Sequence, residues 1–144
     1  MTNAEMLRTW YSEVWEQGNT DAIEQFFTPD ITTEGLIPEM QMDGDDFRDL
    51  VTAFRHILGE ITVEMPKIME SGDWVSAFIH LKTFRADNGA PVTATGQVMA
   101  RFKGEQMVEA YNQFDFVSLF EQLGQFPQDT LPVCMTGQRL DWAG

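Results

Sequence analysis

The first part of the chain places apolar and polar residues at helical spacing. From Ala4 to Gln17, apolar side chains recur every three or four positions with charged residues between them. This spacing predicts one amphipathic helix that ends near Gly18. A second, shorter helix is expected from Thr20 or Asp21 to Phe27, because these side-chain oxygens can accept hydrogen bonds from the free N–H groups at a helix start.

A short extended segment and a third helix follow. Thr28-Pro29-Asp30 is expected to end the second helix, since the residue before a proline disfavours helical geometry. Ile31–Leu36 is predicted as a short strand. Apolar residues then regain helical spacing, and we expect Asp45 or Asp46 to cap a helix that Gly59 closes.

Beyond Gly59 the hydrophobic pattern becomes that of strands. Turn signals containing Gly72, Gly89 and Gly104 separate long segments, and glycine tolerates the positive φ of such turns. Three helices followed by an antiparallel meander of four strands predict an α+β fold. The predicted strands are Ile61–Met69, Trp74–Arg85, Val92–Lys103 and Met107–Leu119.

Length and composition fit a single domain. The chain has 144 residues, 43% of them hydrophobic and 12% aromatic, and no apolar run approaches the roughly 20 residues that cross a bilayer. Residues 1–125 are predicted to form the domain, and residues 126–144 a tail that packs on it or on a partner subunit. Met1–Arg8 has neither a basic nor an apolar signal region, so we expect a cytoplasmic protein.

Charge and cysteine content exclude several classes of partner. Nine Lys and Arg against 23 Asp and Glu give a net charge of −14, which repels nucleic-acid phosphates and anionic lipids alike. Neither a nucleic-acid nor a membrane partner is therefore expected. Cys134 is the single cysteine and cannot form an internal disulfide, so we interpret it as structurally incidental.

Several short segments follow one another in a specific order and spacing along the chain. They are Trp10–Gly18 (WYSEVWEQG), Asp21–Ile23 (DAI), Phe27–Ile31 (FTPDI), Gly44 with Phe47, Gly72–Val75 (GDWV), Thr95-Gly96, Arg101-Phe102 and Val108–Asn112 (VEAYN). This order of landmarks resembles the SnoaL-like polyketide cyclase family of the nuclear transport factor 2-like superfamily, and the resemblance covers roughly residues 4–124. It implies a cone-shaped half-barrel, in which a curved, mostly antiparallel sheet wraps around about three N-terminal helices and an apolar small-molecule pocket. It also implies a homodimer and chemistry without metal or organic cofactor.

The resemblance carries over to this chain only in part. The cyclases place an acid/base aspartate after the aromatic residue of the last long strand, and here Asn112 stands at that place. The positions of two cyclase histidines fall near Val98 and Glu34, whereas the tyrosine of the first helix matches Tyr11. Asn112 cannot exchange a proton usefully, but it can hydrogen-bond a ligand carbonyl.

Asp115, Glu34 and His80 are the candidate acid/base residues. Asp115 could be a base if it faces the pocket, but it could equally cap a helix near Ser118. Glu34 follows the short strand, where the family points a side chain into the pocket, and the alternative is an exposed loop residue. His80 lies mid-strand and could titrate near neutral pH, although an interior or interface histidine is the more common case.

The expected ligand contacts are mostly aromatic. Tyr11 and Trp15 are four residues apart and share one helical face, and Phe54, Tyr111 and Asn112 complete the predicted set. His56 is interpreted as solvated, and neither histidine has close partners for a metal site. These features favour a small-molecule pocket protein. It is either a cofactor-free cyclase, isomerase or hydratase that acts by acid/base chemistry on an apolar carbonyl compound, or a non-catalytic ligand-binding or dimeric interaction module.

Overall fold

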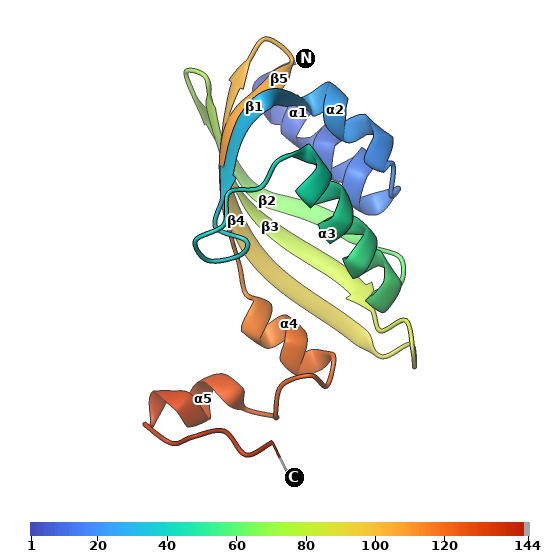
Figure 1. The fold of residues 1–144 in the computed structure, drawn as a ribbon, viewed down its shortest axis with the longest axis vertical. Coiled ribbons are helices and arrows are strands. Elements are labelled where there is room, and N and C mark those ends of the chain that lie inside the picture. Colours follow the sequence, from blue (N-terminus) through green and yellow to red (C-terminus); the bar gives the residue numbers. More distant parts are fainter. Residues whose placement is uncertain (143–144) are drawn as a thin grey trace.

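The computed structural model describes residues 1–142 and has an α+β architecture. Five α-helices accompany a curved, unclosed sheet of five strands, and three of the helices lie against its concave face (Figure 1). The predicted cone-shaped half-barrel is confirmed. Among the described residues, no helix is both long and apolar enough to cross a bilayer.

The first predicted helix forms, with a change of winding at its centre. α1 runs over Asn3–Trp10, and the Thr2 side chain caps it by accepting a hydrogen bond from the Glu5 N–H. The chain then widens into a π-helical segment, Tyr11–Glu16. Such segments are rare and are frequently found at functional sites. Tyr11 is one of the buried residues of this segment.

The second helix is shorter and the following strand longer than predicted. A 3-10 turn, Thr20–Ala22, leads into α2, Ile23–Phe26, and β1 already begins at Phe27 and runs to Glu34. The expectation that the strand starts at Ile31 is therefore wrong at this end. Its pairing shifts register between Phe27 and Thr32, and Pro29 is tolerated there because an irregular edge strand does not require its missing N–H.

The third helix, α3, spans Gly44–Ile57. Its N-cap is Asp43 and not Asp45 or Asp46, which corrects the prediction. Asp43 and Asp46 form a reciprocal capping box, in which each side chain accepts a hydrogen bond from the other's backbone N–H. The sequence contains several acidic residues here, and backbone geometry decides which one caps.

The predicted four-strand meander is confirmed, and the short strand that precedes it, β1, joins the same sheet as a fifth strand. The order across the sheet is β1-β5-β4-β3-β2; β1 runs parallel to β5, and the other pairs are antiparallel. Gly72, Gly89 and Gly104 all have positive φ in or beside the connecting turns. The four meander strands are β2, Thr62–Ser71; β3, Trp74–Phe84; β4, Pro91–Lys103; and β5, Gln106–Phe114.

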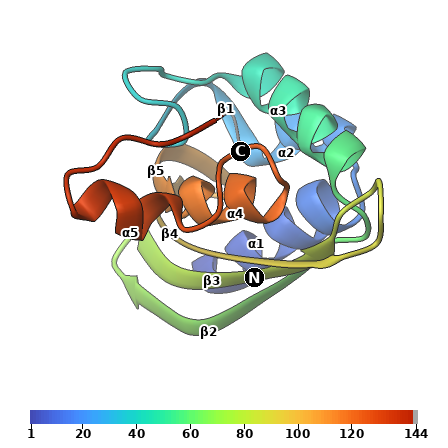
Figure 2. The ribbon, with the colours of Figure 1, turned by 90° about the horizontal axis from the view of Figure 1, so that it is seen from below.

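The last strand ends earlier than predicted. β5 stops at Phe114, and α4, Phe116–Gln122, takes the last four residues of the stretch expected to be strand. A further short helix, α5, spans Thr130–Met135 within the predicted tail. Seen from below, α4 lies across the open end of the sheet, while α5 stands to one side (Figure 2).

Strand alternation divides the sheet into a buried and an exposed face. In β4 every second residue from Val92 to Phe102 is buried, whereas the residues that alternate with them are exposed or half-buried. The buried face forms two hydrophobic clusters: a large one around α1 and α3, and a smaller one that includes Leu119 of α4. The interior of the cone lies where the two clusters meet.

Candidate functional site

A narrow cavity of about 50 Å³ lies between the helices and the concave face of the sheet. Its walls come from both hydrophobic clusters and are almost entirely apolar. The lining residues that carry side-chain N or O atoms are Trp10, Tyr11, Trp15 and Asn112. Three of the five predicted ligand contacts are among these four, and Phe54 is a fourth on the same wall.

Tyr11 brings a hydroxyl group into this apolar space. Its side chain lies in the π-helical segment and is only 5% exposed. Within residues 1–142 no hydrogen bond to the phenol oxygen is formed, and burial raises the pKa of Tyr11 well above the ordinary tyrosine value. The phenol therefore stays protonated and is available as a hydrogen-bond donor.

Asn112 supplies the second polar group of the cavity. It is 6% exposed on β5, and its Nδ2 donates a long hydrogen bond of 3.4 Å to the backbone oxygen of Glu34. No donor within residues 1–142 reaches its Oδ1. Gly35 packs so closely that an added Cβ would lie 1.9 Å from the Asn112 backbone oxygen, so the backbone around Asn112 is tightly confined.

Trp15 and Phe54 form an aromatic wall of the cavity, with ring centroids 6.1 Å apart. Phe54 also stacks on two rings of α4, Phe116 at 5.8 Å and Phe120 at 6.3 Å. Sequence reasoning missed the α4 contribution, because it read Phe116 and Leu119 as the end of a strand.

Tyr111 lies on the opposite face of the sheet from Asn112. Its hydroxyl donates a 2.6 Å hydrogen bond to Glu109, whose other carboxylate oxygen accepts one of 2.7 Å from Arg101. The hydrogen bond from Tyr111, and then that from Arg101, lower the pKa of Glu109, while the bond to Glu109 raises the pKa of Tyr111. Tyr111 is thus separated from the other predicted ligand contacts.

A broad open cleft of about 1040 Å³ runs along this outer face and shares Leu36, Asn112, Phe114 and Phe116 with the lining of the inner cavity. Glu34 lines the cleft, and its carboxylate accepts a 3.1 Å hydrogen bond from Gln41. Glu34 is absent from the lining of the inner cavity. The homodimer that the sequence resemblance implies would use this outer face, and it stays a prediction.

The three predicted acid/base residues are not brought together. His80 is half-buried on the outer face beside Phe78, with ring centroids 4.9 Å apart. Asp115 is exposed at the start of α4, where its carboxylate accepts a 3.0 Å hydrogen bond from the Ser118 N–H. This is the capping arrangement that the sequence left open as the alternative for Asp115.

Comparison with known families matches residues 5–123 to the SnoaL-like polyketide cyclases. The chain belongs to the SnoaL-like polyketide cyclase family. Solved structures of similar fold agree with this assignment, although at their low identity they show the fold alone. A search of curated proteins finds no match.

Three solved structures illustrate the likeness. IdmH of Streptomyces antibioticus, a candidate polyketide cyclase, is 18% identical with a TM-score of 0.76, over 86% of this chain and 99% of its own. AclR of Streptomyces galilaeus, a candidate hydroxylase, is 19% identical with a TM-score of 0.75, over 94% of this chain and 91% of its own. A Catenulispora acidiphila protein of ketosteroid isomerase-like fold, solved with trimethylamine, is 18% identical with a TM-score of 0.71, over 85% and 95% of the two chains.

The inner cavity of this SnoaL-like protein holds few polar groups. The inner cavity presents a phenol and an amide, and none of its lining residues is an aspartate, glutamate or histidine. Within residues 1–142, no group of three or more His, Cys, Asp or Glu residues is placed to hold a metal ion. The arrangement is suited to hydrogen-bonding a carbonyl oxygen in an apolar environment.

Proposed function

We propose that this SnoaL-like protein binds an apolar, ring-containing carbonyl compound in its inner cavity. Tyr11 would donate a hydrogen bond to the ligand carbonyl oxygen, and Asn112 would orient a second polar group of the ligand. The observation that carries the proposal is the pair of polar side chains, one without a hydrogen-bond partner in the described chain, within an otherwise apolar cavity.

The physical argument rests on a hydrogen bond formed in an apolar environment. The Tyr11 hydroxyl has no hydrogen-bond partner within residues 1–142, so a ligand oxygen that accepts from it gains one hydrogen bond, worth about 0.5–1.5 kcal/mol. The aromatic walls formed by Trp15 and Phe54 can pack against the flat rings of the same ligand.

A second candidate function is cofactor-free proton transfer on the same ligand class. A protonated phenol in an apolar cavity is the kind of donor that stabilises a developing enolate oxygen. The base would have to come from the predicted acid/base residues Glu34, Asp115 or His80, and none of these lines the inner cavity. Binding is therefore the better supported of the two functions.

The binding proposal can be tested with the neutral naphthyl ketone prodan, whose emission reports both polarity and hydrogen bonding. We expect saturable binding that Tyr11→Phe weakens by about five- to tenfold, which corresponds to one hydrogen bond of about 1 kcal/mol. Tyr111→Phe is the matched control, because that phenol lies on the outer face. Equal affinity of wild type and Tyr11→Phe would contradict the proposal.

Catalysis is tested separately by exchange of the protons next to the carbonyl of a cyclic ketone in heavy water, followed by NMR. Exchange above the buffer rate that falls in Tyr11→Phe would support the enzymatic function. Exchange at the buffer rate, together with prodan binding, would support a binding protein.

A further inference from the structure

The side chain of Gln122 takes the place of a missing strand beside β4. β5 leaves the sheet at Phe114, which is paired with Gly96, so the first part of β4 has no strand partner on that side. The Gln122 amide fills the gap: Oε1 accepts from the Thr93 N–H at 2.9 Å, and Nε2 donates to the Thr93 backbone oxygen at 2.7 Å. This pair of bonds imitates the pairing of two strands.

The same helix forms a wall of the inner cavity. Phe116 and Leu119 of α4 line the cavity, and Leu119 is only 4% exposed. Because Gln122 ties the end of α4 to β4, it helps to hold Phe116 and Leu119 in the cavity wall, where Phe116 stacks on Phe54.

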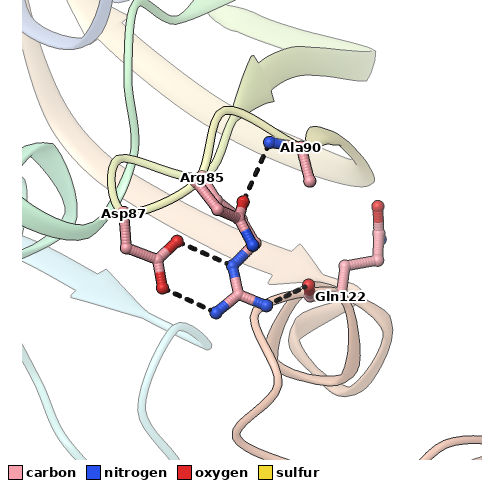
Figure 3. A network of polar contacts seen from close by, with 5 residues as sticks. Arg85, Asp87, Ala90 and Gln122 are labelled. Carbon is pink, nitrogen blue, oxygen red and sulfur yellow. Dashed lines mark hydrogen bonds and ion pairs between the residues drawn. The ribbon is translucent and has the colours of Figure 1, made fainter.

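Arg85 supports the same end of α4 from the turn between β3 and β4. Its guanidinium forms a bidentate ion pair with Asp87, at 2.9 and 2.7 Å, and donates a long 3.5 Å hydrogen bond to the Gln122 backbone oxygen (Figure 3). The side chain and the backbone of Gln122 are therefore held by two different elements.

With α4 in this position the cavity is too small for a ring-containing ligand. Its volume of about 50 Å³ is well below the roughly 300 Å³ at which small-molecule pockets begin. A ligand must therefore move a wall. α4 follows the sheet at Asp115 and is joined to it by the Gln122–Thr93 hydrogen bonds and by the packing of Leu119 and Leu123 in the smaller cluster.

We propose that Gln122 is a positioning residue that latches α4 against Thr93, so that release of the latch widens the inner cavity and determines the size of ligand admitted. This inference rests on the proposed function, because it concerns the same cavity. The apparent affinity for a large ligand is the intrinsic affinity multiplied by the fraction of molecules in which α4 is unlatched. Weakening the latch therefore strengthens binding of large ligands.

The test uses Gln122→Met, which keeps the length of the side chain, and Gln122→Ala as a second variant. Both remove the two hydrogen bonds to Thr93 and also those from Nε2 to the Ser118 hydroxyl and backbone oxygen. Loss of the two bonds is expected to raise prodan affinity about tenfold. Amide hydrogen exchange at Thr93, measured by NMR, is expected to accelerate by a similar factor. Gln122→Glu keeps the acceptor for the Thr93 N–H and is expected to give an intermediate exchange rate. Gln125→Met, at an exposed position just after α4, is the control and should change neither quantity.

The outcomes separate the two proposals. Unchanged prodan affinity in both Gln122→Met and Gln122→Ala would overturn the latch, whether or not Thr93 exchange accelerates. Binding that is insensitive to Tyr11→Phe in the wild-type and the Gln122→Met backgrounds would overturn the proposed function, while the Thr93 exchange rate would still report whether Gln122 holds α4.

Discussion

Asn112 and Tyr111 are neighbours in β5, and their side chains lie on opposite faces of the sheet. Asn112 is 6% exposed and lines the inner cavity, whereas Tyr111 is 36% exposed and donates its hydroxyl hydrogen to Glu109. The inner site therefore takes only one polar residue from this stretch. The two tyrosines of the chain, Tyr11 and Tyr111, consequently lie in very different environments.

The two tyrosines are expected to ionise in separate steps. Burial raises the pKa of Tyr11 strongly, so its neutral form stabilises the fold below the unfolded pKa of about 10, and this contribution is lost as pH rises further. The hydrogen bond to Glu109 raises the pKa of the exposed Tyr111. Phenolate absorbance should show Tyr111 titrating in the folded protein and Tyr11 only on alkaline unfolding.

Tyr111→Phe should remove the first step of this titration, and Tyr11→Phe the second. The unfolding transition in Tyr11→Phe should also move to higher pH. Two tyrosines that titrate together before circular dichroism changes would show that Tyr11 is accessible to solvent.

Gly35→Ala should be among the most damaging small substitutions. Gly35 has a φ of 100°, and its added Cβ would lie 1.9 Å from a backbone oxygen that cannot swing aside. We expect a loss of more than about 3 kcal/mol in the free energy of unfolding, measured with urea. Gly104→Ala is the control: its φ is 63° with no atom within 4 Å, so a loss of only about 1 kcal/mol is expected. Equal losses would show that the contact with Asn112 is unimportant.

Asp115 can be assigned a role by comparing two substitutions. Removing the N-cap with Asp115→Ala should cost about 1 kcal/mol of stability, whereas Asp115→Ser keeps a capping oxygen and should stay within about 0.5 kcal/mol of wild type. Both variants should bind prodan as wild type does. Loss of ketone proton exchange in the stable Asp115→Ser variant would instead establish the carboxylate as the acid/base group.

Asn112→Asp would place a carboxylate at the position where the sequence resemblance predicts the cyclase aspartate. Burial would raise the pKa of this new carboxyl, so its charged form would destabilise the fold as pH rises above the ordinary value of about 3.9. We expect a loss of about 2–4 kcal/mol near pH 7 that becomes smaller near pH 4. Urea unfolding at both pH values measures it, with the exposed Gln113→Glu as control. A loss independent of pH would mean that the new carboxyl is solvated.

Much of the sheet could be predicted because its signals are local. Alternation in β4 and the turn glycines Gly72, Gly89 and Gly104 fix strands and turns without knowledge of the rest of the chain. The end of β5 could not be predicted in this way, because Phe116 and Leu119 suit a strand as well as a helix. The Asp115 cap and the packing of Leu119 against the smaller cluster decide in favour of the helix.

The candidate site was predictable in part. Tyr11 and Asn112 came from the family resemblance, and the structure brings them to one cavity. The outward orientation of His80 could have been predicted from strand alternation, because Val75, Ala77 and Ile79 occupy the inward positions of β3. The role of Gln122 could not be predicted from the sequence. Its amide pairs with the backbone of β4 as a neighbouring strand would, and this is recognisable only when the position of β4 is known.

The parallel pairing of β1 with β5 has a consequence for biosynthesis. The Thr28 hydroxyl donates to the Met107 backbone oxygen, and 79 positions separate these residues. A nascent chain emerging from the ribosome therefore carries β1 while the 79 positions up to Met107 are added, before the strand that completes it exists. Until then its backbone edge is open to pairing with other chains, which makes these early intermediates the natural clients of chaperones.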